Sequence, residues 1–122
     1  MEVKRGDVVI CAAPGDYGKP RPAVVIQSDI FNPTHASVVV CLITTHLLEA
    51  PAFRISLPAG QATGLKQNSQ VMIDKTVTLP RQKITRRVGT LSKEQLREIN
   101  NSVLLFCGLS DVEILTTSSK LQ

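Results

Sequence analysis

Short apolar stretches separated by turn residues occupy the chain as far as about residue 90, and they predict a mainly β fold. The stretch from 37 to 44 is so rich in Val, Ile and Leu that we expect a central strand covered on both faces. In the stretch from 52 to 57, apolar and polar residues alternate, so Arg54 is expected to face solvent. The expected strands are 7–12, 23–27, 37–44, 52–57, 69–74 and 76–79, and a short basic segment follows at 80–87.

A helix is predicted close to the C-terminus. Ser92 and Gln95 form a capping-box pattern, and Gly108 is a natural stop signal. Between them, apolar residues recur at three- or four-residue spacing, at Leu96, Ile99, Val103 and Cys107. We therefore expect a helix over 93–107, a helical turn within the connection at 28–34, and a candidate edge strand at 112–115 inside a tail at 109–122.

The size and charge of the chain indicate how many domains it forms and what kind of partner it binds. With 122 residues, 43% of them hydrophobic, it is expected to form one domain over 1–122 with its core at 3–107. The 14 Lys and Arg against 10 Asp and Glu give a net charge of +4, which favours a polyanionic partner. No apolar stretch reaches the roughly 18 residues of a membrane span, so we expect a cytoplasmic protein without a membrane partner.

The cysteines and histidines indicate neither a disulfide framework nor a metal site. Cys11, Cys41 and Cys107 are odd in number, form no Cys-x-x-Cys pair and lie in or beside apolar segments, so buried free thiols are expected. His35 and His46 show no ligand spacing with each other or with a cysteine. We expect no metal and no cofactor.

The segment from 18 to 26, Gly-Lys-Pro-Arg-Pro-Ala-Val-Val-Ile, is the most informative in the chain. It delivers Arg21 from a loop rich in Pro and Gly directly into an apolar run that is typical of a buried strand. Pro20 and Pro22 restrict the backbone on both sides of Arg21. A guanidinium group held in this way is suited to binding phosphate.

Four pieces of the chain together carry a family resemblance: Lys-Arg-Gly-Asp-Val-Val at 4–9, the loop that ends in Arg21 and Pro22, Val-Val-Ile-Gln-Ser-Asp at 24–29, and Ile43 with Thr44. In this order they resemble the MazF/PemK toxins of toxin–antitoxin pairs, over residues 3–107. The resemblance implies a small SH3-like β-barrel, the CcdB/PemK-like fold, with a C-terminal helix. It also implies sequence-specific, metal-independent cleavage of single-stranded RNA. In that reaction the 2′-hydroxyl attacks the neighbouring phosphorus and leaves a 2′,3′-cyclic phosphate and a 5′-hydroxyl.

The resemblance also implies catalytic residues. Arg21 matches the arginine that the family places at the scissile phosphate, and Thr44 matches a hydroxyl that donates to the phosphate or holds the attacking group. Thr45 competes with Thr44, but neighbouring strand residues point to opposite faces and only one should reach the site. Asp74 matches the carboxylate of an Arg-x-Asp pair in the fifth strand and is a candidate general base, although Met72 stands where that pair has its arginine. His46 is an alternative base.

A second group of residues could bind RNA. Five basic side chains are candidates for a groove along the RNA backbone: Lys19, Arg54, Lys83, Arg86 and Arg87. Tyr17 is the aromatic residue best placed to stack on a base, with Thr45 and His46 as further contacts. Each of these residues also has a structural interpretation, such as a solvated basic face, a loop-capping arginine or a strand-end threonine that bonds to the backbone.

Two other functions stay open at this point. One is a gyrase-binding inhibitor like the CcdB proteins of the same fold, although those end in a Trp-containing tripeptide and this chain has no Trp. The other is a non-catalytic RNA-binding barrel, which the absence of the fifth-strand arginine favours. For the toxin, the resemblance implies a homodimer that binds RNA and is neutralised by a cognate antitoxin with an acidic flexible segment.

Overall fold

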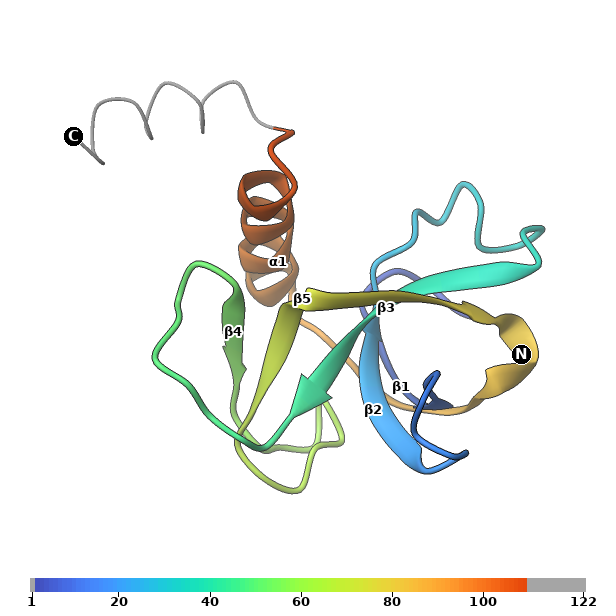
Figure 1. Cartoon of the computed structure of the whole chain (residues 1–122), viewed down its shortest axis with the longest axis horizontal. Coiled ribbons are helices and arrows are strands. Elements are labelled where there is room, and N and C mark those ends of the chain that lie inside the picture. The colour runs from blue at the N-terminus through green and yellow to red at the C-terminus, as the bar shows by residue number, and fades with distance from the viewer. Residues whose placement is uncertain (1, 110–122) are drawn as a thin grey trace.

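The computed structural model describes residues 2–109 as one antiparallel sheet with a C-terminal helix (Figure 1). The strand order across the sheet is β4-β5-β3-β2-β1-β6. This confirms the mainly β fold predicted from the sequence; the candidate strand at 112–115 lies outside the described residues. The elements are β1 (Asp7–Ala12), β2 (Pro20–Val25), β3 (Ser37–Thr44), β4 (Arg54–Leu57), β5 (Ser69–Pro80), a 3₁₀ turn (Arg81–Lys83), β6 (Ile84–Thr90) and α1 (Lys93–Phe106).

The central strands β1, β2 and β3 contribute buried residues to cores on both faces of the sheet, which explains their continuous apolar runs. Helix α1 packs against β4 and β5 at one end of the sheet, and Ile99 of α1 joins a core that includes Val8 and Val24 (Figure 1). On the other face the sheet curls around a second core that includes Val9 and Ala23. Because neighbouring strand residues point to opposite faces, Val8 and Val9 belong to different cores. Full burial of each such side chain stabilises the fold by about 1.5–3 kcal/mol.

The loop after β4 closes the curved sheet against β6. The amide of Thr90 donates to the carbonyl of Ala62 at 2.8 Å. At the adjacent Gly89 a Cβ would clash with the backbone of Ala62 and Thr63, so only glycine permits this approach. The two edge strands of the sheet are therefore linked through a loop.

Several strand boundaries differ from those expected. β4 begins at Arg54 instead of Ala52, β2 ends at Val25 instead of Gln27, and three larger differences concern β2, β5 and β6. β2 begins at Pro20 instead of Ala23 because it pairs with β1 along its whole length, as far as Ala12. β5 is one strand over Ser69–Pro80 where two were expected, and it contains a register shift against β3. The second half of the expected basic segment, 84–87, belongs to β6, which pairs with β1 and exposes Arg86 and Arg87. Each of these three larger differences arises from pairing with a strand distant in sequence.

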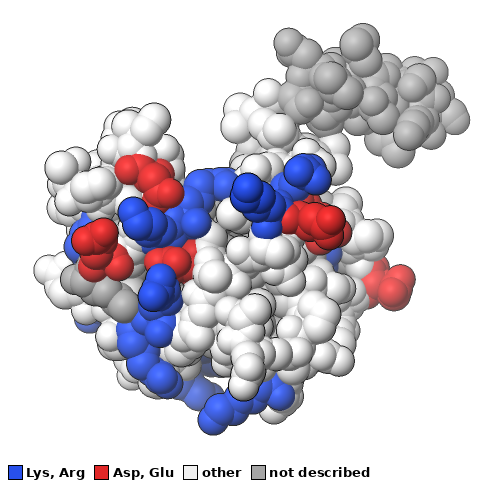
Figure 2. All heavy atoms as spheres, turned by 180° about the vertical axis from the view of Figure 1, so that it is seen from behind, with Lys and Arg blue, Asp and Glu red and all other residues white. Residues whose placement is uncertain are grey.

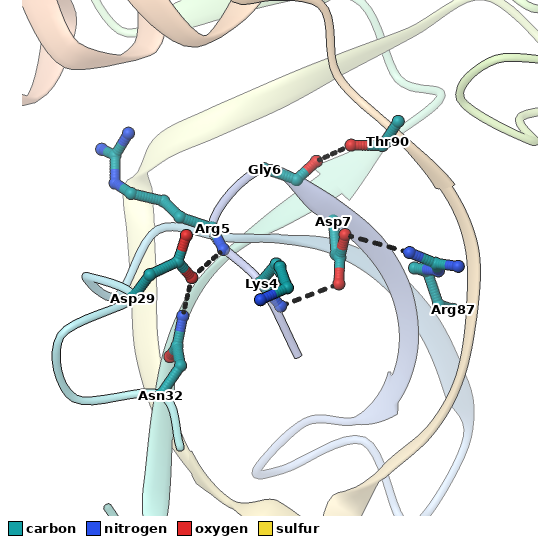
Figure 3. A network of polar contacts seen from close by, with 8 residues as sticks. All are labelled: Lys4, Arg5, Gly6, Asp7, Asp29, Asn32, Arg87 and Thr90. Carbon is teal, nitrogen blue, oxygen red and sulfur yellow. Dashed lines mark hydrogen bonds and ion pairs between the residues drawn. The ribbon is translucent and has the colours of Figure 1, made fainter. Parts of the chain in front are cut away.

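A polar network ties the turn after β2 to the rest of the fold (Figure 3). The Asp29 carboxylate accepts the Arg5 amide and the Asn32 side-chain amide, both at 2.8 Å. These hydrogen bonds, the Arg5 amide foremost, hold the pKa of Asp29 below its usual value. The Arg5 guanidinium also donates to Asn100 of α1 at 2.6 Å. The turn contains the expected helical bonds, such as the Asn32 amide to the Ser28 carbonyl at 3.1 Å.

Helix α1 begins at Lys93 as the sequence predicted and ends at Phe106, one residue before the predicted end. The Ser92 hydroxyl accepts the Gln95 amide at 3.1 Å, and the Gln95 side chain accepts the Ser92 amide at 2.8 Å. Gly108, with φ of 68°, follows the C-terminal end. The prediction that all three thiols are buried was wrong for Cys107, which is exposed because it lies at the end of α1, whereas Cys11 and Cys41 are buried. Among residues 2–109, no helix is long and apolar enough to span a membrane.

Candidate active site

A cavity of about 370 Å³ lies where β2 begins, β3 ends and β5 shifts register. It combines two cationic groups, one carboxylate and one hydroxyl with apolar walls. This combination suits an anionic ligand that must be both bound and exposed to proton transfer. The lining residues are Pro14, Asp16, Arg21, Leu42, Ile43, Thr44, Met72, Lys75 and Val77.

The register of β2 and β3 explains why Arg21 and Thr44 share this cavity. The last paired residues are Ala23 and Leu42, and two further steps in the same register set Arg21 opposite Thr44. Pairing stops before that point because Pro20 and Pro22 have no N–H to donate to β3. The two strands thus end their ladder where these side chains lie on one face, and the cavity opens between them.

The Arg21 side chain is held by a carboxylate from its own loop. Its Nε lies 3.1 Å from Oδ2 of Asp16, and its side chain is 42% exposed. The loop folds back through three residues with positive φ, Gly15 (82°), Tyr17 (54°) and Gly18 (78°), which brings Asp16 beside Arg21. Among the described residues, the two Nη groups of Arg21 have no protein partner. They are the donors available to a ligand in the cavity.

Thr44 uses one of the two acceptor sites of its hydroxyl within the protein. Its Oγ1 accepts the backbone amide of His46 at 3.0 Å. The hydroxyl proton remains available for donation into the cavity. Thr45, the competing residue, is exposed and does not line the cavity, as the alternation of strand faces predicts.

The register shift in β5 decides which of its residues enter the cavity. Cys41 pairs with Thr76 and Ile43 with Val71, so two steps along β3 correspond to five along β5. The surplus residues form a bulge that places Met72 and Lys75 in the cavity lining. Asp74, the expected carboxylate, is exposed and lies outside that lining. The structure therefore brings Arg21 and Thr44 together, but Asp74 does not join them.

The expectation that Arg54 faces solvent was wrong. Its side chain is half-buried, and Nη1 donates to the His46 carbonyl at 3.0 Å and to Oε1 of Gln70 at 2.9 Å. Its Nε is buried without a hydrogen-bond partner. The turn after β3 folds over this edge strand, and alternation within β4 carries no information about that contact.

The other expected RNA-binding residues do not line the cavity. Tyr17 is fully exposed in the loop that carries Asp16. Arg87 faces the buried Asp7, with Nη1 3.7 Å from Oδ1, so part of its charge stabilises the fold (Figure 3). One face of the molecule shows a broken band of Lys and Arg with some acidic residues beside it (Figure 2). The remaining exposed candidates are Lys19, His46, Lys83 and Arg86.

The two buried cysteines are unsuited to act as nucleophiles at this cavity. Cys11 pairs with Arg21 in the sheet, but burial, with a smaller contribution from the Asp16 charge, raises its pKa to about 11. Burial likewise raises the pKa of Cys41. Both thiols are protonated near neutral pH and are poor nucleophiles. Within residues 2–109, no three His, Cys, Asp or Glu side chains gather in a way that could hold a metal ion.

A larger cavity of about 540 Å³ lies elsewhere, between β4 and α1. Its lining includes Arg54, Glu98 and Ser102. The Ser102 hydroxyl already donates to the Ala52 carbonyl at 2.6 Å, and Arg54 is engaged with the turn after β3. We take the smaller cavity as the candidate active site because Arg21, Thr44 and Asp16 line it together and both Nη groups of Arg21 are unengaged there within the described part of the chain.

Sequence reasoning missed three residues of the site and its surroundings: Asp16, Lys75 and Gln70. The Gly-Asp-Tyr-Gly turn at 15–18 was a usable signal for Asp16, since positive φ at both glycines reverses the chain toward Arg21. Nothing local indicated Lys75, because its position depends on the bulge against β3. The role of Gln70 likewise depends on a contact with the turn at 44–48.

The chain is similar to several known proteins over most of its length. Probable endoribonuclease MazF of Mycolicibacterium smegmatis is 43% identical over 109 residues, which cover 88% of this chain and 99% of that protein. Endoribonuclease EndoA of Bacillus subtilis is 26% identical over 116 residues, covering 91% and 99%. The solved Mycobacterium tuberculosis toxin MazF-mt6 superposes with a TM-score of 0.75 at 24% identity, over 85% of this chain and 98% of that chain.

A second solved structure, an endoribonuclease in complex with its cognate antitoxin from a mycobacterial species, gives a TM-score of 0.75 at 20% identity, over 88% of this chain and 97% of that chain. At these identities the two solved structures bear on the fold alone. A family model described as PemK-like, MazF-like toxin of type II toxin-antitoxin system matches residues 4–107. Because this match and the 43% identical relative both span most of the chain, the chain belongs to the PemK-like, MazF-like family of toxins.

Proposed function

We propose that this toxin is a metal-independent endoribonuclease that cleaves single-stranded RNA at a phosphate bound between Arg21 and Thr44. The observation that carries the proposal is the shared cavity, in which two Nη groups and one hydroxyl proton have no protein partner among the described residues. The names of two relatives, an endoribonuclease MazF and an endoribonuclease EndoA, support the same activity.

The reaction that fits these groups is transesterification by the ribose 2′-hydroxyl. The 2′ oxygen forms a bond to phosphorus, the bond from phosphorus to the 5′ oxygen breaks, and a 2′,3′-cyclic phosphate and a 5′-hydroxyl result. The 2′ proton passes to a base, and the leaving 5′ oxygen takes a proton from solvent. Arg21 stabilises the charge that grows on the non-bridging oxygens, and Thr44 donates a hydrogen bond to one of them.

For the base, the geometry favours Asp16 over Asp74. Asp16 lines the cavity and contacts Arg21 at 3.1 Å, whereas Asp74 lies outside the lining. A base must come within hydrogen-bond distance of the proton that it takes, so position is the first criterion. Lys75 adds a second positive charge to the cavity and thereby compensates in part for Met72, which occupies the position of the arginine implied by the family resemblance.

We infer that the protein has a cognate antitoxin, forms a homodimer, recognises a specific RNA sequence and acts in the cytoplasm, where mRNA is found. Solved relatives include an endoribonuclease bound to its cognate antitoxin and MazE-MazF from Deinococcus radiodurans. The net charge of +4 suits an acidic antitoxin segment as well as RNA.

The decisive assay incubates the purified protein with a long single-stranded RNA in excess EDTA and maps the product ends. Cleavage with 2′,3′-cyclic phosphate and 5′-hydroxyl ends is expected. Arg21→Ala should abolish most of it, whereas the matched control Arg97→Ala, at an exposed position on α1, should not. Loss of cleavage in EDTA would contradict the metal-free reaction, and tight RNA binding without cleavage would favour the non-catalytic barrel.

A further inference from the structure

The hydroxyl of Thr44 is oriented by the turn that follows β3. Its Oγ1 accepts the His46 amide at 3.0 Å, a local bond that exists only while residues 44–46 keep this turn. Residues 45–49 are exposed and belong to no helix or strand. Other parts of the fold must therefore hold the turn if Thr44 is to keep one orientation.

Gln70 of β5 supplies that support. The residue is only 8% exposed, and it pairs with Thr44 on one side and Ser56 on the other in the sheet. Its Oε1 accepts the Leu48 amide at 3.0 Å, and its Nε2 donates to the Leu48 carbonyl at 2.9 Å. One buried amide thus binds both backbone groups of Leu48, as a neighbouring strand would.

Arg54 of β4 extends this support to His46. Its Nη1 donates to the His46 carbonyl at 3.0 Å and to Oε1 of Gln70 at 2.9 Å. The amide of His46 binds the Thr44 hydroxyl while its carbonyl is held by Arg54. A continuous chain of hydrogen bonds therefore runs from the buried Gln70 to the hydroxyl in the cavity.

We propose that Gln70 and Arg54 are positioning residues that fix the Thr44 hydroxyl toward the scissile phosphate, and that Arg54 does not itself bind RNA. The inference rests on the proposed function, since it assigns a task to the same cavity. Gln70 lies outside the cavity lining, as does Arg54, so both act through the turn. A misplacement of a catalytic group by about 1 Å can cost up to 10²-fold in rate, so the loss of this support is expected to reduce turnover.

The test replaces each residue by a side chain of similar length without its hydrogen bonds, as Gln70→Met and Arg54→Met. Matched controls are Gln67→Met and Arg97→Met at exposed positions. For both test variants we expect kcat to fall about 10-fold or more with KM nearly unchanged. The dependence of RNA affinity on salt should stay as in the unmodified chain, whereas loss of a phosphate contact would reduce the slope of log K against log salt by about 0.7.

The Thr44→Val background separates positioning through Thr44 from other effects. If Gln70 acts through the hydroxyl, Gln70→Met should cause no further loss of kcat once Thr44 is Val. Additive losses, or a reduced salt slope in Arg54→Met, would overturn the inference. If Gln70→Met fails to fold, as judged by circular dichroism, the half-buried Arg54→Met carries the same test.

A readout that needs no activity keeps this inference distinct from the proposed function. Amide hydrogen exchange of His46 and Leu48 should be faster in both test variants than in the controls. If the unmodified chain cleaves no RNA, the proposed function fails. If it cleaves RNA but exchange at these two amides is unchanged in the variants, the positioning role fails and the endoribonuclease stands.

Discussion

Oδ2 of Asp16 lies 3.1 Å from Nε of Arg21, and this ion pair joins the loop before β2 to the N-terminal end of that strand. The contact uses Nε alone and leaves both Nη groups for a ligand. Asp16 therefore restrains the guanidinium without occupying its phosphate-binding edge. It also puts a carboxylate next to the place where a phosphate would bind.

Asp16→Asn separates the orienting role of this residue from proton transfer. The amide oxygen can still accept from Arg21, but it cannot take up the 2′ proton, so kcat should fall by about 10²-fold or more. Asp74→Asn, the matched change outside the cavity, should leave kcat within about 2-fold of the unmodified chain on the same reasoning. Single-turnover cleavage measures both, and the opposite ranking would return the role of base to Asp74.

Arg21→Ala and Thr44→Val remove the two donors to the phosphate. Each should lower the single-turnover rate by about 10²-fold or more, because donors of this kind act mainly on the charge of the transition state. Thr44→Ser keeps a hydroxyl and should retain most of the activity. Rates that stay unchanged in the first two variants would remove these residues from the site.

Tyr17→Ala tests recognition instead of chemistry. The ring is fully exposed beside the cavity, and stacking of one base is worth about 1–3 kcal/mol, so Kd for RNA should rise about 5-fold or more while kcat changes little. Tyr17→Phe keeps the ring and serves as the control. Equal affinities of the Ala and Phe variants would show that no base stacks here.

The thiols should differ in reactivity as their burial differs. At pH 8, iodoacetamide should modify the exposed Cys107 quickly, while Cys11, with a pKa of about 11, and Cys41 should react only after unfolding. Mass spectrometry of the native and denatured protein counts the modified sites. Rapid modification of Cys11 in the native protein would contradict its burial opposite Arg21.

The lowered pKa of Asp29 predicts how the stability of the fold changes with pH. Its pKa is lower in the folded chain than in the unfolded chain, so its stabilising contribution is present above the unfolded value of about 3.9 and is lost as the pH falls through the folded value. Because the side chain is exposed, we expect less than about 1 kcal/mol from it at neutral pH. Asp29→Asn should lower Tm slightly at pH 7 and should match the unmodified chain near pH 2. A deficit that grows in acid would have the wrong sign.

The sequence predicted those parts of the fold that depend on local pattern. A run rich in Val, Ile and Leu located β3, and capping residues with helical spacing located α1. The alternation of strand faces predicted that only one of Thr44 and Thr45 reaches the cavity. The exposure of Cys107 was not predictable from helical spacing, because spacing does not indicate where the supporting sheet ends.

The parts of the site that were missed depend on contacts between strands. Lys75 lines the cavity, where Asp74 was expected, because β5 forms a bulge against β3. This bulge can be recognised only from the pairing of the two strands. Arg54 loses its expected exposure because the turn at 44–48 lies over it. The family resemblance located Arg21 and Thr44, and the register of β2 and β3 gives the physical reason that they meet.

The most direct test of the account is a crystal structure of the chain with an RNA that it cleaves, carrying a 2′-deoxy sugar at the cleavage position. Without the attacking hydroxyl the RNA binds but is not cut. We expect one phosphate within hydrogen-bond distance of both an Nη group of Arg21 and Oγ1 of Thr44, with Asp16 beside the position of the missing hydroxyl. An RNA that crosses the surface while no phosphate enters this cavity would contradict the account.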